Sequence, residues 1–135
     1  MKPHRTGFVN GCFDVLHIGH IRMLEFASKR CDNLIVGIDS DSRVKQLKGV
    51  NRPVNHQLNR QEFLMALHTV SEVHIFDTDQ GLINLIKSIS PDIMVVGSDY
   101  RNKVVIGSEH AKQLIFFDRI EGYSTSKIVE SSSDR

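Results

Sequence analysis

Short, continuously apolar segments alternate along this chain with segments of helical periodicity, and this alternation constrains the fold more than any other feature. Turn-forming residues bound the apolar segments. A continuous apolar run, rather than one that alternates with polar residues, is typical of a strand covered on both faces. Strands are therefore expected at residues 7–10, 34–38, 73–76, 93–96 and 114–117.

Helical patterns lie between these strands. Their apolar stripes are Ile21, Leu24 and Ala27; Phe63, Leu64, Leu67 and Val70; and Leu82, Leu85, Ile86 and Ile89. Strands that alternate with helices need crossover connections, which produce a parallel sheet. The sequence thus predicts an α/β fold: one doubly wound domain over residues 1–135 with a mainly five-stranded parallel sheet. Residues 48–59 lack periodicity and are expected to form a loop, and residues 131–135 a frayed tail.

The charge balance narrows the choice of partners. Lys and Arg number 17 against 16 Asp and Glu, a net charge of +1, so neither nucleic acid nor a membrane is expected as a partner. The first apolar segment is too short for a signal peptide or a membrane span, which makes a cytoplasmic location the expectation. Cys12 and Cys31 form no CxxC pair and are expected to be free thiols.

The segment that follows the first strand carries the most informative residues. Gly11 lets the backbone come close to a ligand, because it has no side chain to obstruct one. His17 and His20 flank Gly19 at the predicted start of a helix, where unpaired amides and the helix dipole attract phosphate. Two imidazoles there can donate hydrogen bonds to phosphoryl oxygens and stabilise charge that develops on an α-phosphate.

Other interpretations of these polar residues remain open. Two histidines three residues apart could bind zinc, although no third ligand of matching spacing is apparent, or they could be ordinary surface or core histidines. Asp14 and Asp99 follow the first and fourth predicted strands, near the expected reversal of strand order. Either aspartate could contact a ribose or orient the histidines, or simply be a solvated turn residue.

Two motifs resemble those of the cytidylyltransferase-like nucleotidyltransferases. One is a G-x-F-D…H-x-G-H signature, here Gly11, Phe13, Asp14, His17, Gly19 and His20. The other is an E-G-x-S-T-[ST] segment at residues 121–126. The resemblance covers essentially the whole chain and implies a Rossmann-like fold. It also implies in-line attack by a substrate phosphate on the α-phosphorus of an NTP, with Mg²⁺ carried by the NTP and no metal site built from the protein alone.

The resemblance also implies roles for individual residues. The candidate catalytic residues are His17, His20, Lys48 and Ser126. The candidates for nucleotide binding are Asn10, Gly11, Cys12, Phe13, Asp14, Gly19, Gly97, Asp99, Glu121, Tyr123, Ser124 and Thr125. The candidates for the substrate phosphate are Lys45, Arg52 and Arg60, since Lys and Arg bind phosphate oxygens directly. Solvated helix positions are the alternative for the basic residues, and a helix cap is the alternative for the Ser-Thr-Ser segment.

Two branches of this family compete for the substrate. Residues 45–60 and 96–109 resemble the ADP-heptose-forming adenylyltransferases, although Ser98 replaces a common Gly, whereas residues 119–128 resemble glycerol-3-phosphate cytidylyltransferases. The longer central match favours adenylyl transfer from ATP to a sugar 1-phosphate with release of pyrophosphate. Cytidylyl transfer to a polyol phosphate and a non-catalytic nucleotide-binding module are the alternatives. The family tendency towards dimers predicts a homodimer.

Overall fold

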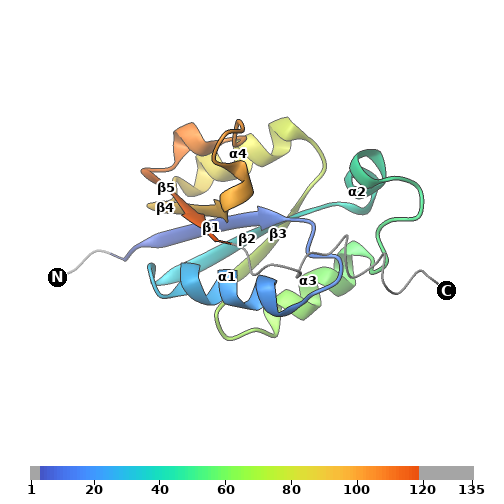
Figure 1. Cartoon of the computed structure of the whole chain (residues 1–135), viewed down its shortest axis with the longest axis horizontal. Coiled ribbons are helices and arrows are strands. Elements are labelled where there is room, and N and C mark those ends of the chain that lie inside the picture. Colours follow the sequence, from blue (N-terminus) through green and yellow to red (C-terminus); the bar gives the residue numbers. More distant parts are fainter. Residues whose placement is uncertain (1–3, 119–135) are drawn as a thin grey trace.

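The computed structural model describes residues 4–118, which form one parallel sheet with helices on both faces (Figure 1). The strands are β1 (Thr6–Gly11), β2 (Asn33–Asp39), β3 (Glu72–Phe76), β4 (Ile93–Gly97) and β5 (Gln113–Phe117). The helices are α1 (Ile18–Ser28), α2 (Asp41–Lys48), α3 (Gln57–Met65) and α4 (Asp79–Ile89), with 3-10 turns η1 (Ser98–Tyr100) and η2 (Ser108–His110). The predicted doubly wound α/β domain with a five-stranded parallel sheet is confirmed.

The strand order is β3-β2-β1-β4-β5, so the order reverses between β1 and β4. β1 pairs with β2 along its whole length, from Thr6 opposite Asn33 to Gly11 opposite Ile38. With β4 it pairs only at its second and third residues, Gly7 and Phe8. The carboxyl-terminal halves of β1 and β4 therefore do not pair with each other, at the point where doubly wound folds bind their ligands.

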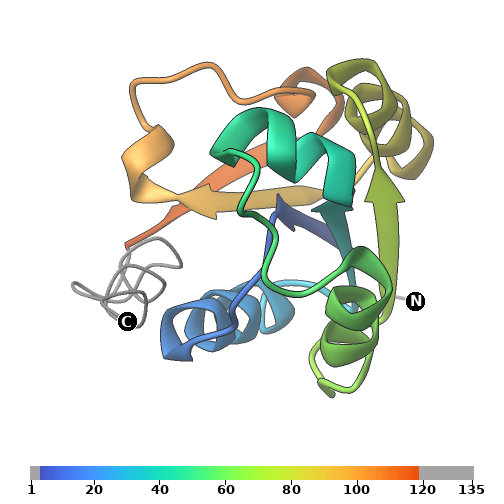
Figure 2. The ribbon, with the colours of Figure 1, turned by 90° about the vertical axis from the view of Figure 1, so that its right-hand side faces the viewer.

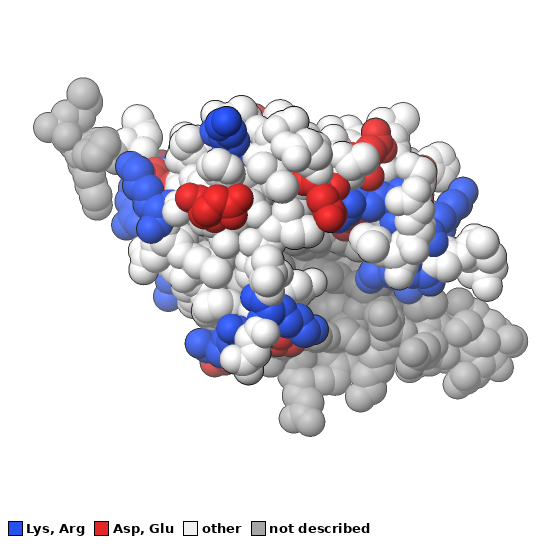
Figure 3. Space-filling model, turned by 90° about the horizontal axis from the view of Figure 1, so that it is seen from above, with Lys and Arg blue, Asp and Glu red and all other residues white. Residues whose placement is uncertain are grey.

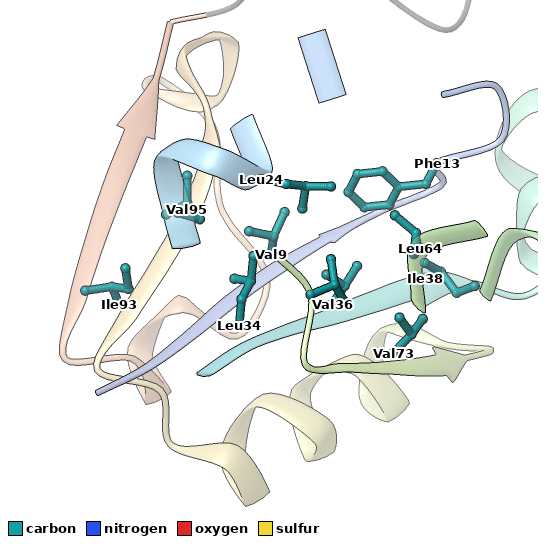
Figure 4. Close-up of a cluster of buried hydrophobic side chains, with 12 residues drawn as sticks. Val9, Phe13, Leu24, Leu34, Val36, Ile38, Leu64, Val73, Ile93 and Val95 are labelled. Carbon is teal, nitrogen blue, oxygen red and sulfur yellow. The ribbon is translucent and has the colours of Figure 1, made fainter. Parts of the chain in front are cut away.

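Helices cover both faces of the sheet, α1 and α3 on one side and α4 on the other (Figures 1 and 2). Leu24 of α1 and Leu64 of α3 belong to one buried cluster together with Val9 and Val36 (Figure 4). A second cluster joins α4 to the opposite face; it contains Phe8, Ile35, Phe76, Leu82, Ile86, Met94 and Val96. Because side chains of both faces are buried, the strands have the continuous apolar runs seen in the sequence.

The connection between β2 and β3 differs from the sequence prediction. Helix α2 occupies residues 41–48 and lies beyond the carboxyl ends of the strands (Figures 1 and 2). It buries only Val44, so it shows no apolar stripe. Helix α3 begins at residue 57 and ends at residue 65, so the expected loop shrinks to residues 49–56. Leu67 and Val70 pack against the core from the turn after α3.

Two further sequence expectations concern the thiols and membrane spans. Cys12 and Cys31 are both free, as predicted. Within residues 4–118, none of the helices has the length and apolar character needed to cross a membrane. The predicted frayed tail at residues 131–135 lies outside the described residues.

Candidate active site

A cleft of about 440 Å³ opens at the carboxyl ends of β1 and β4. Asn10 and Gly11 of β1 and Gly97 of β4 line it. All three residues lie beyond the positions at which the two strands are paired, so the separation of the strands creates the opening. A cleft at the reversal of strand order is the place where this class of fold is expected to bind a nucleotide.

Most of the predicted site residues that the structure describes lie together in this cleft. They are Asn10, Gly11, Cys12, Phe13, His17, Gly19, His20, Lys48, Gly97 and Asp99. Four predicted residues are not part of the lining: Asp14, Lys45, Arg52 and Arg60. The candidates of the end motif, Glu121, Tyr123, Ser124, Thr125 and Ser126, lie outside the described residues.

The two histidines form a reciprocal cap at the start of α1. Nδ1 of His17 accepts a hydrogen bond from the amide of Gly19 at 3.0 Å, and Nδ1 of His20 accepts one from the amide of His17 at 3.2 Å. Because each Nδ1 is an acceptor, the neutral ring carries its proton on Nε2. The rings stack with their centroids 3.9 Å apart. Both imidazoles thus line the cleft in a fixed orientation with the ring proton on Nε2, and Nε2 of His17 is itself buried.

This cap changes one part of the sequence interpretation. The sequence predicts that amides at the helix start are available to a phosphate, but the Gly19 amide is already hydrogen-bonded to the His17 ring. A phosphate in the cleft would meet imidazole groups rather than this amide. Phe13 is 3% exposed, and its ring lies 5.2 Å from that of His20, so it supports the histidine from the core side.

Cys12 lies in the cleft as a protonated thiol. Burial raises the pKa of this thiol above its ordinary value, and the positive charges of Lys48 and Arg60 oppose that shift without reversing it. A thiol that stays protonated near neutral pH is a poor nucleophile. Cys12 is therefore a lining residue rather than a candidate for covalent catalysis.

Helix α2 supplies the basic side of the cleft, and Lys and Arg side chains gather at this end of the molecule (Figure 3). Lys48 and Arg43 both line the cleft, whereas Lys45 is exposed outside it. Sequence reasoning missed Arg43. Its guanidinium is held 2.7 Å from a carboxylate oxygen of Asp39 and 2.7 Å from one of Asp79. The sequence pattern that could have revealed it is an aspartate at the end of a buried strand, followed four residues later by an arginine on the next helix.

Asp14 is buried beneath the cleft, which corrects its predicted contact with the nucleotide. Its carboxylate accepts hydrogen bonds from Nε of Arg52 at 2.9 Å and from the amides of Val54 and Asn55, each at 2.8 Å. The side chain is 0% exposed. Asp14 therefore anchors the 49–56 loop to the connection between β1 and α1.

Arg60 is also buried, which corrects its predicted contact with the substrate phosphate. It lies inside α3, and its side chain is 0% exposed. Its guanidinium donates to the carbonyls of Cys12, Asp39 and Asn55 and to a carboxylate oxygen of Asp41, over distances of 2.7–2.9 Å. Complete burial leaves no surface on this side chain for a substrate. The alternative of an exposed arginine at a helix end is wrong as well.

The predicted role of Arg52, binding of the substrate phosphate, remains a proposal. The guanidinium pairs with Asp14, and the side chain is 11% exposed. Its Nη2 is buried and has no hydrogen-bond partner among the described residues. A buried arginine nitrogen without an acceptor commonly marks the place of an anion or water.

Side chains that could bind a metal do not cluster in the part of the chain that is described. No cluster of three or more His, Cys, Asp or Glu residues within residues 4–118 is arranged to hold a metal ion. Within these residues the zinc interpretation of His17 and His20 thus has no third ligand, and Nδ1 of each ring is occupied by a backbone amide. The expectation that Mg²⁺ arrives with the NTP remains a prediction.

Comparison with known proteins assigns the chain to a family. The family model described as cytidylyltransferase-like matches residues 8–131. The chain belongs to the cytidylyltransferase-like family. The prediction of a nucleotidyltransferase is thereby confirmed at the level of the family. This cytidylyltransferase-like domain has its cleft where the strand order reverses, with the signature histidines in it.

The cytidylyltransferase-like chain has bacterial relatives that are much longer. It is 52% identical over 133 residues to the bifunctional protein HldE of Campylobacter fetus subsp. fetus, covering 96% of this chain and 29% of that protein. It is 48% identical over 131 residues to the bifunctional protein HldE of Helicobacter hepaticus, covering 97% and 27%. The chain therefore spans less than a third of the length of these relatives.

Two solved structures share the fold. The lipopolysaccharide core biosynthesis protein from Thermoplasma volcanium superposes with a TM-score of 0.72 at 20% identity, covering 88% of this chain and 100% of that one. The pantothenate synthetase from Thermus thermophilus superposes with a TM-score of 0.61 at 12% identity, covering 95% and 65%. Both similarities support the Rossmann-like fold of this cytidylyltransferase-like domain.

Proposed function

We propose that this domain transfers an adenylyl group from Mg²⁺-ATP to a sugar 1-phosphate, specifically heptose 1-phosphate, and releases pyrophosphate. An oxygen of the sugar phosphate forms a bond to the α-phosphorus, while the bond from that phosphorus to pyrophosphate breaks. The observation that carries the proposal is the pair of stacked imidazoles in the cleft, each with its proton on Nε2. Preorganised donors of this kind stabilise the negative charge that builds on phosphoryl oxygens during displacement.

The other cleft residues divide between the nucleotide and the phosphates. Asn10, Gly11, Gly97 and Asp99 lie on the two strand ends or just after them and are proposed to contact the nucleotide. Lys48 is proposed to act as a point charge on a phosphate. Arg52, whose Nη2 is buried without a hydrogen-bond partner among residues 4–118, is proposed to bind the acceptor phosphate once the site is filled. The end motif at residues 121–126 is proposed to bind the triphosphate, and this role rests on the resemblance alone.

The choice of ATP over CTP rests on which segments build the cleft. The central stretches that resemble the heptose adenylyltransferases contribute Lys48, Gly97, Asp99, Tyr100 and Ile106 to the lining. The segment that resembles the cytidylyltransferases is expected to handle phosphates, which every NTP shares. Discrimination between bases comes from contacts to the ring edge. The segments near the strand reversal therefore carry more weight for the choice of base.

A screen of NTPs against acceptors tests this assignment. We expect initial rates of pyrophosphate release with ATP and heptose 1-phosphate to be at least ~10-fold higher than with CTP and either heptose 1-phosphate or glycerol 3-phosphate, since specific polar contacts discriminate between bases. A preference for CTP would replace the adenylyl proposal and leave the family assignment intact. Tight nucleotide binding without pyrophosphate release from any pair would favour the non-catalytic module.

Removal of the divalent ion tests the form in which the NTP binds. We expect a chelator to abolish pyrophosphate release and added Mg²⁺ to restore it fully, because Mg²⁺ usually binds through phosphates and keeps several of its waters. Metal analysis of the dialysed protein is the accompanying measurement. Zinc that stays bound in stoichiometric amounts and is needed for turnover would contradict this expectation.

The proposal extends to the cellular location and the assembly of the domain. We place the domain in the cytoplasm, where its expected substrates, an NTP and a phosphorylated sugar, are found. The homodimer is proposed from the tendency of the family. Residues 1–135 are proposed to act as one nucleotidyltransferase domain.

A further inference from the structure

The positively charged side chain of Arg60 lies beneath the cleft and is not part of its lining. The Arg60 side chain is 0% exposed, and its hydrogen-bond acceptors come from different segments of the chain. Nη1 donates to the carbonyl of Cys12 at 2.9 Å and to that of Asp39 at 2.7 Å. Nε donates to the carbonyl of Asn55 at 2.9 Å, and Nη2 to the carboxylate of Asp41 at 2.7 Å. A single rigid fork therefore joins three backbone carbonyls and one side-chain carboxylate.

Two of these acceptors continue the central pair of strands. The ladder between β1 and β2 ends at Gly11 opposite Ile38; Cys12 directly follows β1, and Asp39 is the last residue of β2. Nη1 of Arg60 bridges their carbonyls where the strands stop pairing with each other. The guanidinium of Arg60 thus fixes the spacing between the end of β1 and the end of β2 at Cys12 and Asp39, both of which line the cleft.

Each clamped segment carries a group that faces the substrates in the proposed reaction. The chain leaves Cys12 for the connection that ends at His17, the N-cap of α1. Asp39 holds Arg43, and Asp41 is the first residue of the helix that carries Lys48. On the other side, Asn55 is docked on Asp14 through its amide. Arg60 therefore sets the distance between the histidine side and the basic side of the cleft.

We propose that Arg60 is a positioning residue for nucleotidyl transfer, which holds the histidine-bearing connection and helix α2 at a fixed separation without touching the substrates. This inference rests on the proposed function. Catalysis by fixed donors depends strongly on geometry, and a misplacement of about 1 Å can lower the rate by roughly 10²-fold. The loss of these hydrogen bonds of Arg60 should thus lower kcat more than it lowers the affinity for the nucleotide.

The conservative variant Arg60→Lys tests the role of the fork, because lysine keeps the charge and cannot reach all four acceptors. We expect a folded protein with kcat about 10²-fold lower and a KM for the NTP within about 3-fold of wild type. Arg30→Lys is the matched control and should leave both constants unchanged: this exposed arginine lies two residues after α1, and among the described residues it contacts Phe26 through a hydrogen bond to the carbonyl and through its ring. If Arg60→Lys raises KM alone, Arg60 contacts a substrate and the proposal fails.

A second variant keeps the proposal testable if Arg60→Lys does not fold. Asp41→Ala removes one acceptor of the fork from a side chain that is 33% exposed and leaves Arg60 in place. We expect kcat to fall about 10-fold with little change in KM. An Asp41→Ala or folded Arg60→Lys protein with the kcat of wild type would overturn the proposal.

The thiol of Cys12 gives a readout that needs no turnover. In a Cys31→Ser background Cys12 is the only cysteine of the chain, and a serine can still donate to the carbonyl of Ala27 as Cys31 does. We expect Arg60→Lys to speed alkylation of Cys12 several-fold at fixed pH, because the released connection exposes the thiol while the positive charge is retained. An unchanged alkylation rate would overturn the proposal that Arg60 holds these segments in place, even if the wild-type protein releases no pyrophosphate. If only the proposed function is wrong, alkylation of Cys12 should still be faster in Arg60→Lys than in the protein with Arg60.

Discussion

Loss of either imidazole in the cleft is expected to lower kcat for pyrophosphate release by at least ~10²-fold, because transition-state donors are removed. The test variants are His17→Asn and His20→Gln. Asn is among the best N-cap residues, and Gln at the third helical position can complete the reciprocal cap. The free energy of unfolding should therefore change by less than about 1 kcal/mol. The measurements are steady-state kinetics and denaturant unfolding on the same preparations.

Two further variants distinguish a loss of catalysis from a loss of helix capping. His17→Ala removes the acceptor for the Gly19 amide together with the ring, so it should lose a further ~0.5–2 kcal/mol of stability. His74→Gln changes a histidine on β3 that is 44% exposed, and it should leave kcat unchanged. Stable His17→Asn and His20→Gln proteins with near-normal kcat would remove both histidines from catalysis.

Truncation of Asp14 is expected to destabilise the fold by about 3–5 kcal/mol. Asp14→Ala leaves the buried guanidinium of Arg52 without its counter-charge and removes the acceptor from the amides of Val54 and Asn55. Unfolding in urea, followed by circular dichroism, measures the change. The 49–56 loop should also become more sensitive to limited proteolysis, because its main attachment to the β1–α1 connection is lost.

An exposed aspartate supplies the control for Asp14. The side chain of Asp32 is 53% exposed and accepts a hydrogen bond from the amide of Arg5. Asp32→Ala should cost less than about 1 kcal/mol, since solvent replaces the lost contact. If Asp14→Ala instead keeps the stability of wild type and raises the KM for the NTP, Asp14 binds the nucleotide as the sequence predicts, and the structural role is wrong.

Periodicity was sufficient to predict the architecture, because burial on both faces of a sheet requires continuous apolar strands. All five predicted strands occur, and the two histidines do stand at the start of a helix that follows the first strand. Apolar periodicity did not reveal helix α2, because it buries only Val44 and shows no apolar stripe. The end of α3 was misplaced because Leu67 and Val70 continue the apolar spacing after the helix has ended.

The sequence by itself determined the fold class, the family and the place of the site, since these depend on local periodicity and on motifs of adjacent residues. Only the tertiary structure decided which polar residues face the cleft. Asp14 belongs to the first motif and Arg60 to the central stretch that resembles the adenylyltransferases, yet both side chains are fully buried, whereas Arg43 lies in the cleft lining. The physical reason is that the burial of a charged side chain depends on partners far along the chain. Asp14 meets a loop some 40 residues away, and Arg60 meets the carbonyl of Cys12, 48 residues before it.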